Sequence, residues 1–490
     1  MDLESLPIRV QLGAIGSMAF NSAHFLFFFP IVLAGYWSLR RNPAFRIGFL
    51  LAASYYFYMS WSIAYGLLML AMTAVDFVVA GRIVATHDPR GKRRWLTLSI
   101  ASNLGMLFLF KYFNFFADNL SAAAGGLGAS WTTVHLDLEL PLGISFFTFE
   151  ALSYTIDVYR GKAQPTRSFW RFALFISFFP RMIAGPIIRA SNFLPQIEHD
   201  PRWDDREAES GLARILAGLF KKVIIADLLG VTLVDPVFAN PSAYSSWTLL
   251  IAMYGYALQI YYDFSGYSDV ALGAARMLGF TLPFNFNRPY LATSMRDFWR
   301  RWHISLSTWL RDYLYIPLGG GRGSAWKTVR NLAIVMLLGG LWHGAAWGFV
   351  IWGAAHGLLL GLGRLFHAAT GIDADRLEQP PLSRAARVAV TFHLVAACFV
   401  LFRAVDFAKA SAYLTRLVQV EPGANGVSQV AYVILVVALA IELMPRRWMS
   451  MLTESYTRIP AKIQGGLVAA SVLLFTALGD TGTPFIYFQF

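Results

Sequence analysis

The stretch Leu341-Trp342-His343-Gly344-Ala345 lies in the middle of an apolar run that decides how this chain folds. The 33 residues between Arg330 and Arg364 include no Lys, Arg, Asp or Glu. A straight helix of that length would measure about 50 Å, well beyond the roughly 30 Å of hydrocarbon in a bilayer. We therefore expect two shorter segments joined near 342–348, with His343 at membrane depth and both basic ends on one face of the membrane.

An imidazole at membrane depth has two interpretations. A polar group is costly there, which makes it by default a candidate for a functional site. A histidine that only bonds a neighbouring helix would fit the same apolar pattern. The pattern alone leaves both interpretations of His343 open.

The composition places the whole chain in the membrane. Of its 490 residues, 56% are hydrophobic and 14% are charged, which excludes an ordinary soluble globular protein. The net charge of +12 comes from 41 basic and 29 acidic residues. In a membrane protein this excess indicates cytoplasmic loops and not nucleic-acid binding. The only cysteine, Cys398, allows neither an internal disulfide nor a cysteine–histidine metal cluster.

Basic residues cluster on alternate turns of the chain. They gather at 40–46, 82–94 and 160–171, whereas the connection 117–139 holds three acidic residues and no Lys or Arg. The alternation predicts that the basic loops are cytoplasmic and that 117–139 faces outside. We expect eleven to thirteen membrane segments in a single integral-membrane domain, 1–490. The aromatic C-terminus, 483–490, should then lie at the outer interface.

Two of the predicted spans are interrupted by polar or helix-breaking residues. The span 172–188 contains Pro180 and Pro186, at which a helix is expected to break. The span 247–262 is followed by Asp263 and Asp269 and then by a helix at 270–278. We expect these two carboxylates to be buried partners for arginines of the next segment.

Two further acidic residues, Asp76 and Asp157, lie near the ends of predicted spans. A side chain in such a position can reach the interface, as long polar side chains do at helix ends. We therefore expect both carboxylates to extend to water.

The segment 284–323 departs from the general pattern because it combines many charges with many aromatic residues. So many charges cannot face lipid, and the aromatic density is too high for a free loop. We expect a helix in the cytoplasmic interface or a re-entrant element. Its cations would meet either lipid phosphates or an anionic substrate.

Common catalytic motifs are absent from the sequence. It contains no Gly-x-Ser-x-Gly elbow, no His-Glu-x-x-His zinc helix and no Walker loop. What remains is the pair His303 and His343, forty residues apart.

Several long stretches resemble the membrane-bound O-acyltransferases, and within that family the bacterial alginate O-acetyltransferase branch. The likeness runs from about residue 24 to 490, with the catalytic core at about 140–365. The stretches that carry it are 141–149 (PLGISFFTF), 179–186 (FPRMIAGP), 218–223 (GLFKKV), 259–269 (QIYYDFSGYSD), 284–290 (FNFNRPY), 295–313 (MRDFWRRWHISLSTWLRDY), 338–345 (LGGLWHGA) and 401–404 (LFRA).

The resemblance implies an all-α polytopic membrane protein, with a ring of about 11–13 transmembrane or re-entrant helices around a thinned catalytic core. A cytoplasmic funnel would admit the acyl donor, and an outer opening would admit the acceptor. His343 would be the catalytic histidine and His303 would occupy the second active-site position. No permanently bound cofactor and no metal is implied.

The chemistry follows from the donor. A thioester such as acetyl-CoA is already activated, so the enzyme must deprotonate an attacking hydroxyl and stabilise an oxyanion. A buried, neutral imidazole at His343 suits the first task. His303 would donate a hydrogen bond to the thioester oxygen or orient the acceptor. Cations at the cytoplasmic mouth would attract the phosphates of the donor; the candidates are Arg296, Arg300, Arg301, Arg322 and Lys327.

The resemblance also implies a place and partners. The protein would lie in a bacterial inner membrane and pass the acetyl group to a periplasmic partner of the serine-hydrolase type, which acetylates an exopolysaccharide such as alginate. Competing acceptors are teichoic acid, peptidoglycan and lipid hydroxyls. Two other classes stay open: a transporter or lipid flippase, which would share interrupted spans, and a non-catalytic scaffold of a polysaccharide export complex.

Overall fold

A computed structural model describes residues 18–128, 133–183, 185–372, 380–404, 406–445, 447–448, 451, 456 and 458–478. Within these ranges the chain is helical, and the β-structure consists of an isolated bridge between Tyr244 and Ala424. The predicted all-α class is thereby confirmed. The expected interfacial position of 483–490 lies outside the described residues.

The helices differ widely in length, and several are interrupted by π-helical or 3₁₀ turns. In chain order they are α1 (Ala23–Ser38), α2 (Pro43–Met59), α3 (Ile63–Ala85), α4 (Pro89–Leu107), η2 (Phe108–Tyr112), α5 (Phe113–Gly126), α6 (Ile144–Tyr159), α7 (Phe169–Ser177), α8 (Phe179–Met182), α9 (Ala190–Glu198), α10 (Asp205–Leu219), η3 (Phe220–Asp227), η4 (Gly230–Val234), α11 (Asp235–Ala239), η5 (Pro241–Ala243), α12 (Ser246–Met277), η6 (Pro289–Leu291), α13 (Met295–Arg301), α14 (Ile304–Leu310), η7 (Arg311–Tyr315), α15 (Ala325–His343), α16 (Trp347–Thr370), α17 (Pro381–Ala404), α18 (Phe407–Gln419), α19 (Gln429–Leu443) and α21 (Ala461–Leu478).

Four helical stretches of the described chain are long and apolar enough to cross a membrane. They are 63–85, 89–126, 347–370 and 381–404, and shorter apolar helices occupy 23–38, 429–443 and 462–475. The arrangement is that of a multi-pass membrane protein. The total of eleven to thirteen segments stays a prediction, because many of the other helices are short or broken.

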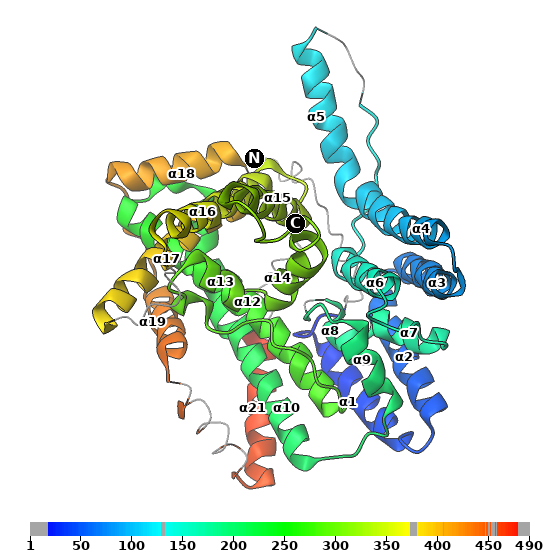
Figure 1. The fold of residues 1–490 in the computed structure, drawn as a ribbon. Helices are drawn as coiled ribbons and strands as arrows, with labels where there is room; N and C mark the ends of the chain where they lie inside the picture. The colour runs from blue at the N-terminus through cyan, green and yellow to red at the C-terminus, as the bar shows by residue number, and fades with distance from the viewer. Residues whose placement is uncertain are drawn as a thin grey trace.

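The long helix α12 lies at the centre of the fold. It packs against α10, η3, α8, α17 and α18. In Figure 1, α1, α2, α7 and α9 gather on one side of the molecule, α13 to α17 gather on the other, and α5 projects away from the body. The α15–α16 pair, which carries His343, therefore belongs to the half of the molecule opposite the N-terminal helices.

The prediction of two separate helices around Asp263 and Asp269 is wrong, because α12 continues through both carboxylates for 32 residues. Its partners also differ from those expected. The Nζ atom of Lys222 lies 2.7 Å from Asp263, and that of Lys221 lies 2.6 Å from Asp269. Both lysines belong to η3, which precedes α12 in the chain, whereas we expected arginines of the segment that follows it. A carboxylate with a cationic partner is tolerated inside a buried helix.

The expected breaks are confirmed, since α7 ends at Ser177, α8 begins at Phe179, and Pro186 lies between α8 and α9. The expectation that Asp76 reaches water is wrong. Its carboxylate is fully buried and accepts hydrogen bonds from Ser99 at 2.6 Å and from Asn103 at 2.9 and 3.0 Å. Neighbouring helices supply the partners that water would otherwise provide.

Candidate active site

The apolar run of 33 residues forms a helical hairpin, as predicted. Helix α15 ends at His343, and α16 begins at Trp347. The two helices approach closely because glycines face the contact: a Cβ on Gly353 would overlap the carbonyl oxygen of Met336. The hairpin therefore places His343 at its closed end, and the basic residues that flank the run lie at its open end.

His343 is buried in an aromatic cage. Only 4% of the residue is exposed. Its imidazole lies 5.0 Å from the ring of Trp342, 5.1 Å from Trp352 and 5.2 Å from Phe402, measured between ring centroids. A cage of this kind excludes water from the imidazole, which strengthens any electrostatic interaction formed inside it.

His303 lies at the junction of two short helices, α13 and α14, in the segment that we predicted to be interfacial or re-entrant. It is fully buried, and its backbone is left-handed, with φ of 41°. Such a φ is uncommon for a residue other than glycine, and strained residues of this kind cluster at functional sites. Asn285 fixes the junction, because it accepts hydrogen bonds from the backbone N–H of Ile304 at 2.9 Å and of Ser305 at 3.2 Å.

The fold brings the two histidines together. The imidazole of His303 lies 6.1 Å from the indole of Trp342, the same ring that packs against His343. Two residues forty positions apart in the chain thus pack against the same indole ring.

A third buried histidine, His356, was missed by the sequence analysis. It is fully buried and accepts a hydrogen bond from the indole N–H of Trp299 at 3.3 Å. Its ring lies 4.6 Å from that of Trp352, which also contacts the ring of His343. The signal was available, because His356 is the second titratable residue of the same apolar run.

Lys111 was missed for a related reason. It lies inside a predicted span, 96–116, as a lone cation among apolar residues. In the structure its ammonium group donates to the backbone carbonyls of Trp342 at 2.7 Å and His343 at 2.9 Å. An ionisable residue within a membrane span is a functional candidate by default, so this lysine could have been singled out from the sequence.

The five candidate donor-binding cations lie in two places: three on α13, which precedes His303, and two near the start of α15. Arg296, Arg300, Arg322 and Lys327 are exposed, whereas Arg301 is partly buried and pairs with Asp297 at 2.9 Å. Lys327 belongs to the first turn of α15, sixteen residues before His343, which corresponds to about 24 Å along the helix. The structure thus places Lys327 and His343 at opposite ends of α15.

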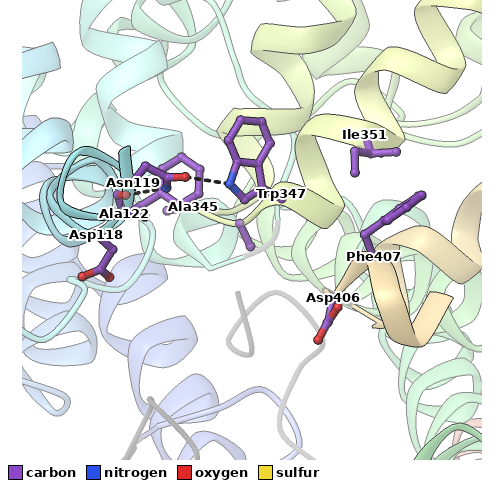
Figure 2. Close-up of a pocket in the computed structure, with 10 residues that line it drawn as sticks. Asp118, Asn119, Ala122, Ala345, Trp347, Ile351, Asp406 and Phe407 are labelled. Carbon is purple, nitrogen blue, oxygen red and sulfur yellow. Dashed lines mark hydrogen bonds between the residues drawn. The ribbon is translucent and has the colours of Figure 1, made fainter. Parts of the chain in front are cut away.

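A pocket of about 630 Å³ lies at the turn that follows His343, where Ala345 and Ala346 are among its lining residues. Its lining comes from α5, from the turn between α15 and α16, from the first turns of α16 and from the start of α18 (Figure 2). The indole N–H of Trp347 donates to Asn119 at 2.8 Å across this pocket, and the rings of Phe115 and Trp347 lie 5.8 Å apart. The full lining is Phe115, Asp118, Asn119, Ala122, Ala345, Ala346, Trp347, Ile351, Asp406 and Phe407.

The pocket combines aromatic faces with carboxylates and an amide. Asp118 and Asp406 are its charged members, and both are acidic. Asp118 belongs to the connection that we predicted to face outside. A titratable imidazole thus lies between a basic helix start and an acidic pocket.

Comparison with known proteins identifies a family and several similar chains. A model of the MBOAT, membrane-bound O-acyltransferase family, matches residues 162–402. The chain is 44% identical over 390 residues to a "Probable alginate O-acetylase AlgI" of Pseudomonas aeruginosa, which covers 79% of this chain and 72% of the relative. It is 36% identical to a "Peptidoglycan O-acetyltransferase" of Helicobacter pylori, over 84% of this chain and 81% of the relative.

A more distant relative is a "Teichoic acid D-alanyltransferase" of Streptococcus thermophilus, which is 30% identical over 53% of this chain and 68% of the relative. The matches include both histidine-bearing segments, because the family model covers His303 and His343. The chain belongs to the membrane-bound O-acyltransferase family.

Proposed function

We propose that this membrane-bound O-acyltransferase takes acetyl groups from acetyl-CoA at the cytoplasmic face of a bacterial inner membrane and passes them outward for O-acetylation of an exopolysaccharide such as alginate. The names of its relatives support the acyl group and the acceptor class. One observation carries the proposal: His343 lies at the closed end of the α15–α16 hairpin, with basic residues at the other end of α15 and the acidic pocket next to it.

His343 acts as the general base. Its imidazole takes the proton of an acceptor hydroxyl while the hydroxyl oxygen attacks the acetyl carbonyl carbon. The tetrahedral intermediate then collapses, the carbon–sulfur bond breaks, and the CoA thiolate recovers the proton from the imidazolium. His303, which shares the indole of Trp342 with His343, donates a hydrogen bond to the carbonyl oxygen as negative charge develops there.

The donor approaches along α15. The phosphates of CoA bind near Arg322 and Lys327 at the start of α15, and Arg296, Arg300 and Arg301 of α13, which packs against α16, add positive charge on the approach. The distance of about 24 Å from Lys327 to the level of His343 calls for a long, narrow donor, a shape that the pantetheine arm of CoA provides.

The acceptor enters from the pocket beyond His343. Aromatic faces such as that of Trp347, together with the polar atoms of Asn119 and the carboxylates of Asp118 and Asp406, suit a hydroxyl-bearing group. That hydroxyl belongs either to the polysaccharide or to a serine of a periplasmic partner of the serine-hydrolase type, which completes the transfer.

The test is acyl transfer by the purified full-length chain in lipid vesicles. The donor is labelled acetyl-CoA, and the acceptor is unacetylated alginate with or without a periplasmic extract of an alginate-producing bacterium. His343→Ala should lower transfer by about a hundred- to ten-thousand-fold, the usual contribution of a general base. The control is His87→Ala, since His87 is exposed on the loop between α3 and α4.

The outcomes separate the competing classes. Transfer that persists in the His343→Ala variant contradicts the proposal and favours a scaffold. Label that crosses the vesicle membrane at the normal rate in this variant, without transfer by either protein, favours a transporter.

The peptidoglycan relative offers a second acceptor, because it aligns over 84% of this chain. The two acceptors are distinguished in an alginate-producing Pseudomonas strain that lacks its own alginate O-acetylase. Expression of this chain should restore acetyl groups on alginate. Acetyl groups that appear instead on the muramic acid of peptidoglycan would assign the second acceptor.

A further inference from the structure

The carboxyl end of α15 has backbone carbonyls that need hydrogen-bond donors from outside the helix. The last four carbonyls of a helix have no partner within it. After His343 the chain continues at Gly344 in an extended conformation, with φ of −166° and ψ of 153°. Each unpaired backbone group in a membrane interior costs several kcal/mol, so that these carbonyls need donors from elsewhere.

Two consecutive residues of another helix supply the donors. The ammonium group of Lys111 lies 2.7 Å from the carbonyl oxygen of Trp342 and 2.9 Å from that of His343. The hydroxyl of Tyr112 donates to the carbonyl of Leu341 at 3.0 Å. Three of the last four carbonyls of α15 are therefore bonded by side chains that are more than 220 positions away in the sequence.

Lys111 and Tyr112 belong to a π-helical turn, η2, inside the helical run 89–126. In a regular α-helix, neighbouring residues do not face the same way. The wider π-turn interrupts that geometry at the point where both side chains reach the end of α15. Turns of this kind occur frequently at functional sites.

The charge of Lys111 fits this position. A cation inside a membrane span is expensive, and it usually persists there only with specific partners. In the described part of the chain, Lys111 donates its hydrogen bonds to backbone carbonyls and not to a carboxylate. The carboxyl end of a helix is partially negative, which stabilises a cation at this point.

We propose that Lys111 is a positioning residue for His343, with Tyr112 as its auxiliary. Lys111 bonds the carbonyl of His343 itself, so it fixes the backbone from which the imidazole projects. A general base acts only within a narrow range of distance and direction, and a misplacement of about 1 Å costs on the order of a hundredfold in rate. This inference rests on the proposed role of His343 as the base.

The experiment compares Lys111→Met, Lys111→Arg and Tyr112→Phe in the vesicle assay with labelled acetyl-CoA. Lys111→Met should lower kcat by about ten- to a hundredfold and change the KM for acetyl-CoA by less than about threefold. Lys111→Arg should recover most of the loss, because a guanidinium can also donate to both carbonyls. Tyr112→Phe, which removes a single bond, should cost about two- to fivefold.

Two controls separate positioning from a general loss of folding. Lys409→Met removes an exposed lysine of α18 and should have no effect. Thermal unfolding and gel filtration give the folded fraction of each variant, and kcat is expressed per folded protein. In addition, Lys111→Met in a His343→Ala background should lower the residual rate by less than about twofold, because the two residues act as one unit.

Several outcomes overturn the inference. A normal kcat per folded protein in Lys111→Met would do so, as would an equal loss with and without His343, or no recovery with Lys111→Arg. An inactive His343→Ala variant beside a fully active Lys111→Met variant would refute this inference alone. A fully active His343→Ala variant would refute the proposed function together with it.

Discussion

Two lysines are held inside this membrane protein in opposite ways. Lys222 lies 2.6 Å from Asp227 and 2.7 Å from Asp263, so its charge is matched by carboxylates. Lys111 is bonded to the carbonyls at the end of α15. The first arrangement ties η3 to α12, whereas the second ties η2 to the residue that we propose as the base.

The two arrangements should serve different purposes, namely stability at Lys222 and activity at Lys111. In the Lys222 cluster, one ammonium group lies between carboxylates of η3 and α12, and its removal would leave uncompensated buried charge. At the hairpin end, the cation satisfies the backbone, and the imidazole of His343 is surrounded by aromatic rings. Changes in the first region should therefore affect folding, and changes in the second should affect turnover.

The largest expected effect is that of Lys222→Met. It leaves Asp227 and Asp263 without their cation, which should reduce the free energy of unfolding by about 3–5 kcal/mol. The measurement is unfolding in detergent, followed by circular dichroism. The double change Lys222→Met with Asp263→Asn should recover part of the loss. A normal unfolding transition in Lys222→Met would show that the cluster is not a stabilising unit.

His303→Ala should have the next largest effect, on turnover instead of folding. If His303 donates to the oxyanion, its loss should lower kcat by about a hundred- to a thousandfold, as loss of an oxyanion-hole donor does elsewhere. His303→Asn retains a donor and should keep more activity than the alanine variant. Equal activities of the two variants, measured with labelled acetyl-CoA, would contradict the donor role.

Gly353→Ala tests the contact between α15 and α16. Its methyl group would overlap the carbonyl oxygen of Met336, so the helices must separate. Overpacking of this kind costs about 1–3 kcal/mol of unfolding free energy, and it should also lower kcat because α15 carries His343. Gly363→Ala is the matched control on α16, because a Cβ there meets no atom within 4 Å. Equal stabilities of the two variants would show that the close approach is dispensable.

The smallest effect should come from the exposed cations. Arg322→Ala with Lys327→Ala should raise the KM for acetyl-CoA by about two- to fivefold and leave kcat unchanged, because exposed charges contribute less than about 1 kcal/mol each. The difference from the unmodified chain should shrink as salt is added. An unchanged KM at low ionic strength would exclude these two residues from the donor site.

Much of this fold can be predicted from the sequence because hydrophobic length is a local property. The 33-residue run is too long for one span, and it forms the expected hairpin with its turn beside His343. The break at Pro180 follows from the missing N–H of proline. The continuity of α12 could not be predicted in this way, because it depends on lysines from another helix.

The candidate site likewise has features that the sequence predicts and features that only the tertiary structure reveals. The sequence by itself determined the class of the protein and singled out His343, because an imidazole in an apolar run is conspicuous whatever surrounds it. His303 lies in a charge-rich segment, and it was singled out through the resemblance of that segment to the family. Only the tertiary structure decided that His303 and His343 share the indole of Trp342, and that Lys111 bonds the backbone of His343. Hydrogen bonds and ring contacts depend on distances of a few ångströms between segments far apart in the chain, and such distances are set by packing and not by local pattern.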